Sequence, residues 1–361
     1  MVQDGARGTT SGASASPAGS RFEKARSLDT VRHLTDPWQL GPLTVPNRVV
    51  LAPLAGIGNW FVRLQAKRYG AGLAFSEMVS SFAIHYGNHK TLTELLVVHP
   101  DEKRAGQGPV AIQLFGHDPD IMRSAAAASA AAGADVIDLN MGCPVPKVLK
   151  TGAGAALLSD PDTAVRVARA AAEGSGLPVT VKLRASRRPG QREGVDLARR
   201  LVEEAGVAGL TFHPRSAAVR HQGTPDYDLA AELVAELSVP VIVSGGLHDA
   251  DHVRWVFHYT GAAAVMLARG ALGNPWLFAQ VLGTSDGEPT HEEILVEWEW
   301  VIDRAAEHLG ADRAARYLRK FHPWYAERLG VPRGTQDALQ RAATLAEQRA
   351  ILTGLRVLQA A

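Results

Sequence analysis

The chain has 361 residues and a formal net charge of +1, and 46% of its residues are hydrophobic and 21% charged, a composition that excludes a disordered or fibrous protein. Its single cysteine excludes an internal disulfide and a cysteine-rich zinc site, so it is neither a disulfide-stapled secreted scaffold nor a zinc ribbon. The composition predicts a protein of a reducing compartment, the cytoplasm.

The first segment, residues 1–36, opens on a stretch rich in Gly, Ser and Ala, and we expect a disordered tail there. It has no apolar core of signal-peptide length, and no run of about 18 apolar residues follows, so we expect no membrane span. We also expect no bound metal, because His213 and His221 are eight residues apart without a carboxylate pattern. We expect the protein to act as a monomer.

Short β-branched or apolar runs then alternate with Ala-rich amphipathic segments, which is the rhythm of repeated βα units. The runs cover residues 48–56, 73–80, 110–116, 136–142, 179–185, 210–215, 239–246 and 263–270. Eight such units predict an α/β fold, a closed (β/α)8 TIM barrel over residues 37–287. An open, doubly wound sheet is the alternative.

One segment between the runs illustrates the expected helices. Ser159 or Asp160 can cap it, and Pro161 suits its first turn. Gly174 or Gly176 can end it. The same signals recur between other runs, as a barrel requires.

From residue 288 to residue 361 the pattern changes to helical periodicity without strands. Residues 292–310 and 337–359 are its clearest stretches. This part of the chain predicts a second, all-helical domain.

In a TIM barrel the active site lies at the carboxyl ends of the strands, so the last residues of each run deserve inspection. They are polar in most runs: Gln113, Asn140, Lys182, Arg184, His213, Arg215, Ser244, Gly245, Gly246 and Arg269. Such a ring of polar strand ends predicts a binding or catalytic site at the barrel mouth.

The last two runs predict a phosphate site. Gly245 and Gly246 free the backbone N–H groups for phosphate oxygens, and Arg269 can add a charge-assisted hydrogen bond. The alternative is a tight loop beside a surface arginine.

Lys182 stands in an otherwise apolar run, and a buried ammonium group needs an anionic partner. A flavin can provide one, because positive charge near its pyrimidine edge stabilises the anionic reduced form. A buried ion pair and a Schiff-base lysine are the alternatives. Gln113 can donate and accept along the same flavin edge. His213 can bond a ligand or be a core histidine.

The only cysteine, Cys143, follows the run 136–142 in a Gly-Cys-Pro turn on the expected mouth of the barrel. A small buried hydrophobic residue is the ordinary role of a free cysteine. Its place among the polar strand ends favours a chemical role instead.

A set of segments in this order resembles the tRNA-dihydrouridine synthase family, over about residues 46–325. The segments are LAPLAG, SEMVS, QLFGHDP, DLNMGCPVPKVLKTGAGAALL, VKLR, HPR, VIVSGG and LARGALGNPW. The resemblance is to the FMN-dependent, bacterial type. It implies a barrel that binds FMN, a helical tRNA-binding domain, and the reduction of specific uridines in tRNA to 5,6-dihydrouridine with NADPH as electron donor.

The resemblance also implies roles for individual residues. The cofactor would be held by Pro53, Leu54, Ala55, Gln113, Lys182, His213, Ser244, Gly245, Gly246, Ala268 and Arg269. Cys143 would be the proton donor and Asn140 would orient the base. Reduction of the uracil double bond needs hydride at C6 from flavin N5 and a proton at C5 from the other face. A thiol, mostly protonated at neutral pH yet able to release its proton, suits this step.

The near-neutral charge gives no overall sign of nucleic-acid binding, so only local clusters can indicate it. Arg184 and Arg215 begin two basic loops that open on the same barrel face. We expect them to contact RNA, together with Lys147 of the family motif and with Arg319 and Lys320 of the helical domain. The alternative is that these are ordinary solvated charges.

Two other functions compete with this one. An FMN barrel of the dihydroorotate or dihydropyrimidine oxidoreductase type would act on a free pyrimidine, and it would need neither the helical domain nor the arginine loops. The other alternative is a barrel that binds RNA without catalysis.

Overall fold

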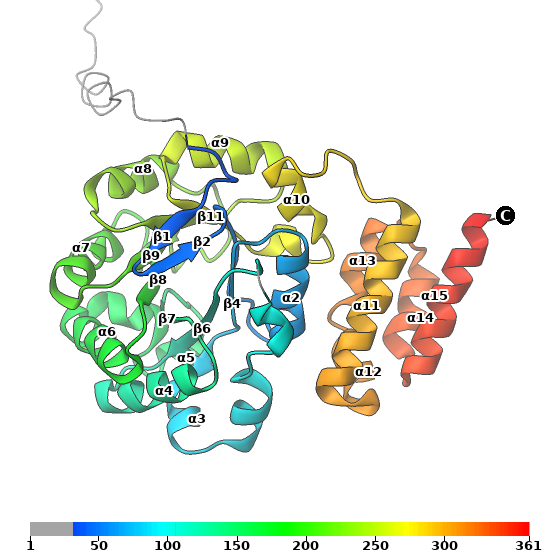
Figure 1. Ribbon diagram of the computed structural model, residues 1–361, viewed down its shortest axis with the longest axis horizontal. Coiled ribbons are helices and arrows are strands. Elements are labelled where there is room, and N and C mark those ends of the chain that lie inside the picture. The colour runs from blue at the N-terminus through cyan, green and yellow to red at the C-terminus, as the bar shows by residue number, and fades with distance from the viewer. Residues whose placement is uncertain (1–31, 105, 361) are drawn as a thin grey trace, which may run out of the picture. The chain divides into compact units, whose positions relative to one another are not determined.

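A closed barrel of eight parallel strand positions forms in the part of the chain that the structure describes, residues 32–104 and 106–360 of a computed structural model (Figure 1). Its strands are β3 (Val49–Leu51), β4 (Leu73–Phe75), β6 (Val110–Phe115), β7 (Val136–Met141), β8 (Val179–Ser186), β9 (Gly209–Ser216), β10 (Val241–Ser244) and β11 (Ala264–Leu267). The ring closes because β3 pairs with β11 and β4 pairs with β6. The predicted TIM barrel is confirmed, and the open sheet is excluded.

Each predicted run contains one of these strands, but some strands are shorter than their runs. The run 48–56 yields only Val49–Leu51, and the run 239–246 only Val241–Ser244. The remaining residues of both runs become loops at the mouth. The run 73–80 divides into β4 and a two-residue strand β5 (Val79–Ser80), which pairs with the end of β6.

A hairpin that the sequence did not predict precedes the barrel. Its strands β1 (Trp38–Leu40) and β2 (Leu43–Val45) pair antiparallel. Trp38, Leu40 and Val45 are buried with the inward-facing residues of the barrel strands. Leu40 also contacts the position of Gly209, at the start of β9. The hairpin therefore closes the amino-terminal end of the barrel.

Helices surround the strands (Figure 1). The longer ones are α2 (Trp60–Arg68), α4 (Pro119–Ala131), α6 (Pro161–Ser175), α7 (Glu193–Ala205), α8 (Tyr227–Glu236), α9 (Ala250–Thr260) and α10 (Trp276–Leu282). Shorter turns of helix are α3 (Ser81–His85) and α5 (Pro146–Leu149), a π-helix at Thr91–Leu95, and 3-10 helices at Pro100–Lys103, Gly154–Ser159 and Arg269–Ala271.

The caps of α6 decide between the alternatives left open by the sequence. Asp160 caps it by accepting from the Thr163 N–H, and Gly176 ends it with φ of 64°. Gly174 instead lies inside the helix, where an added Cβ would stand 2.1 Å from the carbonyl oxygen of Arg123 on α4. This glycine lets α4 and α6 pack closely.

The carboxyl-terminal part is helical, as predicted, with α11 (His291–Leu309), α12 (Ala311–Leu318), α13 (His322–Arg328), α14 (Arg333–Arg341) and α15 (Leu345–Ala360). The periodic stretch 337–359 is divided between α14 and α15. Thr344 and Glu347 form reciprocal hydrogen bonds at this break and start the second helix. The domain limits at 36/37 and 287/288 stay predictions, and most of the predicted tail lies outside the described residues.

Helix α2 joins the barrel to the helices that follow it. Gln65 donates to Glu297 Oε1 on α11 and to the hydroxyl of Tyr325 on α13, both at 2.8 Å. Asn59, the N-cap of α2, donates to the hydroxyl of Tyr317 at 2.7 Å. These groups are largely buried, so the contact is part of the folded core.

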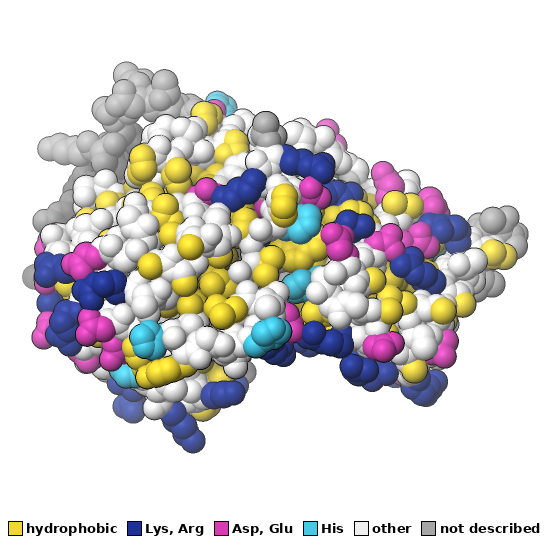
Figure 2. All heavy atoms as spheres, turned by 60° about the horizontal axis from the view of Figure 1, so that its bottom comes forward, with side chains coloured by type: hydrophobic (Ala, Val, Ile, Leu, Met, Phe, Trp, Pro, Cys, Tyr) yellow, Lys and Arg dark blue, Asp and Glu magenta, His cyan; other side chains and the backbone are white. Residues whose placement is uncertain are grey.

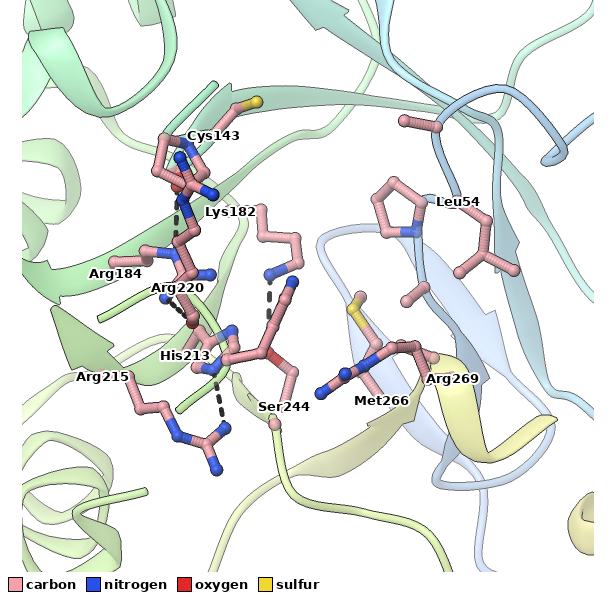
Figure 3. A pocket seen from close by; sticks show the side chains of 18 of the residues that line it. Leu54, Cys143, Lys182, Arg184, His213, Arg215, Arg220, Ser244, Met266 and Arg269 are labelled. Carbon is pink, nitrogen blue, oxygen red and sulfur yellow. Dashed lines mark hydrogen bonds between the residues drawn. The ribbon is translucent and has the colours of Figure 1, made fainter. Parts of the chain in front are cut away.

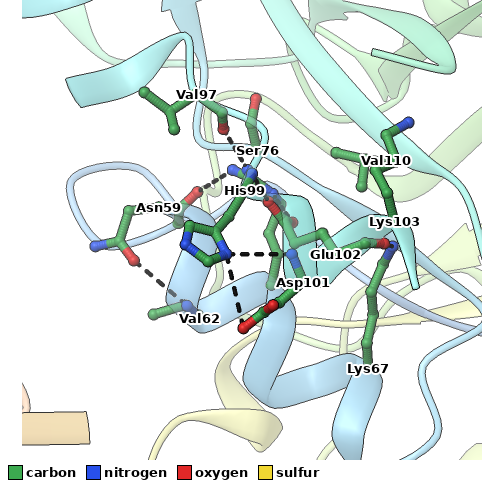
Figure 4. Close-up of polar contacts among 12 residues, drawn as sticks. Asn59, Val62, Lys67, Ser76, Val97, His99, Asp101, Glu102, Lys103 and Val110 are labelled. Carbon is green, nitrogen blue, oxygen red and sulfur yellow. Dashed lines mark hydrogen bonds and ion pairs between the residues drawn. The ribbon is translucent and has the colours of Figure 1, made fainter. Parts of the chain in front are cut away.

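Helix α2 also carries a buried ion pair, with Glu102, and Figure 4 shows Glu102 among its polar neighbours. Arg63 Nε and Nη2 donate to the two carboxylate oxygens of Glu102 at 2.7 and 2.8 Å, and both side chains are 0% exposed. Lys67 donates to the carbonyl oxygens of Glu102 and Gly108, and burial lowers its pKa to about 8. The pair fixes α2 against the segment that leads into β6.

Glu102→Ala should strongly destabilise the protein, because it leaves the Arg63 guanidinium buried without its carboxylate. We expect a loss of about 3–5 kcal/mol in the free energy of unfolding, measured by urea denaturation. Glu173→Ala, which breaks the exposed pair with Arg123, is the control and should leave the urea midpoint nearly unchanged. Equal losses in the two variants would contradict this role of the buried pair.

Candidate functional site

A cavity of about 550 Å³ opens at the carboxyl ends of the barrel strands (Figure 3). It brings together most of the predicted site residues: Pro53, Leu54, Ala55, Gln113, Asn140, Cys143, Lys182, Arg184, His213, Arg215, Ser244, Gly245, Gly246, Ala268 and Arg269. Its volume falls within the range of about 300–1,000 Å³ found for small-molecule sites. In Figure 3, Leu54 and Arg269 lie on one side and Cys143, Arg184 and His213 on the other.

Three predicted site residues lie elsewhere. Lys147 is exposed on α5. Arg319 follows α12, and its carbonyl oxygen accepts from Gln340. Lys320 donates to the carbonyl oxygen of Gly56 at 2.9 Å and borders a second cavity, of about 340 Å³. These three residues therefore do not line the barrel cavity. Their contact with RNA stays a prediction.

The charge of the cavity is one-sided. Lys182, Arg184, Arg215, Arg220 and Arg269 line it, and the described lining residues include no Asp or Glu. Figure 2, by contrast, shows Lys and Arg beside Asp and Glu near the left edge and on the right part of the surface it presents. A cavity with this lining is suited to an anionic ligand.

The pKa values of the lining groups reflect this crowding. Burial, and then the neighbouring Arg184, lowers the pKa of Lys182 to about 8. Burial together with Lys182 and Arg184 depresses the pKa of His213 far below its usual range, so this histidine is neutral at physiological pH. Lys182 Nζ donates to Ser244 Oγ at a long 3.4 Å and has no carboxylate bonded to it among the described residues.

Arg184 and Arg215 already bond to the backbone. Arg184 donates to the carbonyl oxygens of Gly142, Ser216 and Arg220, at 2.7 to 3.1 Å. Arg215 donates twice to the carbonyl oxygen of Gly223. Both side chains therefore hold the loops of the mouth, whatever further contact they make with RNA.

The loop after β10 requires its two glycines. Gly245 and Gly246 have φ of 100° and 82°, and an added Cβ would stand 2.6 Å from His213 Nε2 or from the Tyr227 hydroxyl, respectively. The Tyr227 hydroxyl also donates to the Gly245 carbonyl oxygen. Backbone without side chains is thus held against the cavity, next to Arg269.

The loop of Cys143 is fastened on both sides. The N–H groups of Gly142 and Cys143 donate to Asn140 Oδ1 at 3.2 and 2.9 Å. On the other side, the Ala155 N–H donates to the Cys143 carbonyl oxygen. A Cβ on Gly154 would stand 2.8 Å from that oxygen, so glycine is required there. The half-buried thiol is therefore held at the cavity wall.

Asp138 is a polar residue that the sequence did not single out. It is fully buried on β7, two residues before Asn140 and on the same face of the strand. Its carboxylate accepts from Gln113 Nε2 and Thr180 Oγ1, both at 2.6 Å, and burial raises its pKa to about 7. The sequence does contain a signal for Asp138: a charged residue within an apolar run, as with Lys182.

Among the described residues, no group of three or more His, Cys, Asp or Glu side chains lies close enough together to hold a metal ion. In the same part of the chain, no helix has the length and apolar character needed to cross a membrane.

Solved structures share the barrel. The chain aligns with morphinone reductase at a TM-score of 0.51 and 20% identity, over 74% of this chain and 94% of that one. A variant of NCR from Zymomonas mobilis gives a TM-score of 0.54 at 16% identity, over 73% and 96%. At these identities the likeness concerns the fold alone.

Sequence comparison is more specific. A tRNA-dihydrouridine synthase B of Pasteurella multocida is 34% identical over 294 residues, which are 80% of this chain and 86% of the relative. That of Serratia marcescens is 38% identical over the same shares. The family model described as dihydrouridine synthase (Dus) matches residues 50–360. The chain therefore belongs to the dihydrouridine synthase family.

Proposed function

We propose that this protein reduces specific uridines in tRNA to 5,6-dihydrouridine, with FMN in the barrel cavity and NADPH as electron donor. The observation that carries the proposal is the position of the only cysteine at the wall of a cation-lined cavity that Gly245 and Gly246 also line. The curated relatives bear the name tRNA-dihydrouridine synthase B. We further propose that it acts as a monomer in the cytoplasm.

The cavity fits a flavin mononucleotide in three respects. Gly245, Gly246 and Arg269 offer open backbone and a guanidinium to a phosphate. Pro53 and Leu54 offer an apolar strip to a ring system. Lys182 has a buried ammonium group without a bonded carboxylate, which an anionic ring edge would complement.

When bound, FMN supplies the hydride that uracil C6 requires. The chain supplies the rest. Cys143 holds a proton at Sγ for C5, and Asn140 orients the loop that carries the thiol. His213, held neutral by burial and by neighbouring cations, can bond the cofactor without adding charge. Lys182 keeps the potential of the site positive.

The RNA must present an unpaired uridine at the barrel mouth, and unstacking it costs energy that contacts to neighbouring nucleotides restore. We propose that the helices after residue 287 and the exposed basic residues provide these contacts. Under this proposal the protein reduces a tRNA transcript and leaves free uridine unchanged. Reduction of free uridine at a similar rate would favour the barrel oxidoreductases of free pyrimidines.

Cys143→Ala should abolish the reaction with RNA and spare the steps before it. We expect dihydrouridine formation in an unmodified tRNA transcript to fall by at least about 100-fold, because the proton donor to C5 is lost. FMN content and the rate at which NADPH bleaches the bound flavin should stay within about twofold of the unaltered protein, since the thiol is not needed for either. Wild-type dihydrouridine formation by Cys143→Ala would refute the assigned role.

The affinity for FMN should depend on pH through Lys182. Its pKa is lowered to about 8 in the free protein, and a bound anion would raise it, so binding takes up a proton above pH 8. Affinity measured by flavin fluorescence should therefore be flat from pH 7 to 8 and fall by up to about tenfold per unit above it. Lys182→Met should bind more weakly and lack this fall. An identical pH dependence in both proteins would exclude Lys182 as the cause.

A further inference from the structure

We infer that Asp138 is a positioning residue of the proposed reaction. Acting through Gln113 and Asn140, it fixes which hydrogen-bonding atoms face the cavity, and it holds the loop that carries Cys143. The inference rests on the proposed function for its catalytic consequence, but the geometry that leads to it involves only this chain.

The direction of the chain of hydrogen bonds is set first at the thiol loop. The backbone N–H groups of Gly142 and Cys143 can only donate, so the atom of Asn140 that faces them must be its oxygen. The Asn140 amide nitrogen is thereby turned toward Gln113, and it donates to Gln113 Oε1 at 2.9 Å.

The orientation at the barrel core agrees with this direction. Gln113 Oε1 accepts from Asn140, so Nε2 is the atom of Gln113 that faces Asp138, and it donates to Oδ2 at 2.6 Å. The other carboxylate oxygen accepts from Thr180 Oγ1. Both ends agree with the same orientation of the two amides. Reversing either amide alone would bring two nitrogens or two oxygens together.

This arrangement leaves a defined pattern at the cavity wall. Gln113 and Asn140 both line the cavity, and each keeps one N–H hydrogen that the chain of bonds does not use. The Asn140 amide nitrogen also makes a weak contact to Met78 Sδ, at 3.7 Å. The wall therefore offers donors to a ligand edge that carries acceptors, such as the carbonyl oxygens of a pyrimidine ring.

A carboxylate is a costly way to fill a barrel interior. Asp138 is 0% exposed, and its raised pKa reflects the unfavourable burial of its charge. An apolar side chain at this place would pack without that cost. What the carboxylate provides, and an apolar side chain cannot, is a hydrogen-bond acceptor for Gln113.

Because the chain has one cysteine, thiol alkylation reports on the Cys143 loop alone. Asp138→Leu removes the acceptor, and in the full-length protein without FMN we expect the rate of iodoacetamide reaction to change by at least about threefold. Asp138→Asn should react within about twofold of the unaltered rate, because its oxygen can face Gln113 while its nitrogen donates to the Thr180 hydroxyl. Thr211→Val is the matched control, because valine has the shape of threonine. Thr211 lies inside the barrel on β9, and its hydroxyl has no hydrogen-bond partner among the described residues. It should leave the rate unchanged.

If Asp138→Leu does not fold, Gln113→Leu breaks the same chain at its middle and should change the alkylation rate in the same direction. An unaltered rate in Gln113→Leu, or in a folded Asp138→Leu, would overturn the inference. A change as large in Thr211→Val would overturn it too, because the effect would then be general loosening of the barrel.

Activity provides a second readout. Asp138→Leu should lower kcat/KM for tRNA by at least about 30-fold, and the double variant with Gln113→Leu should be no worse than Gln113→Leu alone, within about twofold. Multiplying losses would show that Asp138 does not act through Gln113. The two proposals fail separately: an active Cys143→Ala refutes the proposed function and leaves the alkylation result intact, whereas unaltered alkylation in Asp138→Leu refutes only the inference.

Discussion

Closure of the parallel sheet is the constraint on which the site depends. Once β4 pairs with β6 and β3 pairs with β11, the carboxyl ends of eight strand positions face one mouth. Residues as distant in sequence as Leu54 and Arg269 then line the same cavity. Parallel strands in a ring are connected by helices on the outside of the barrel. The residues at the strand ends, and the loops that follow them, therefore form the site.

The charged groups inside the barrel differ in how well the protein compensates their burial. Lys182 and Arg184 have lowered pKa values and Asp138 a raised one, in each case chiefly because they are buried. Arg184 is satisfied by backbone carbonyls and Asp138 by two donors. Lys182 is left with one long hydrogen bond to a hydroxyl, so an anionic ligand would stabilise its charge.

Much of this could be predicted from the sequence, because strand runs and helix caps are local signals. The eight runs each contain a strand, and Pro161 begins α6 as expected. The β1–β2 hairpin was missed because three-residue strands carry too little alternation to be recognised. Gly174 was ambiguous because its reason for being glycine is the Arg123 carbonyl on another helix. Most predicted site residues meet in one cavity since they stand at or just after strand ends, which a closed barrel brings to one mouth. The position of Lys320 depends on a contact with Gly56, more than 250 residues away, which no local pattern reveals.

The β1–β2 hairpin limits how ligands can reach the barrel cavity. Its Trp38, Leu40 and Val45 cover the amino-terminal end with apolar side chains, packed among buried apolar residues of the barrel strands. Of the two ends of the barrel, the hairpin thus covers one, and the cavity lies at the other. Under the proposed function, the nicotinamide of the electron donor and the base of the RNA would both approach the flavin from the carboxyl-terminal end, so the two would compete for the same space.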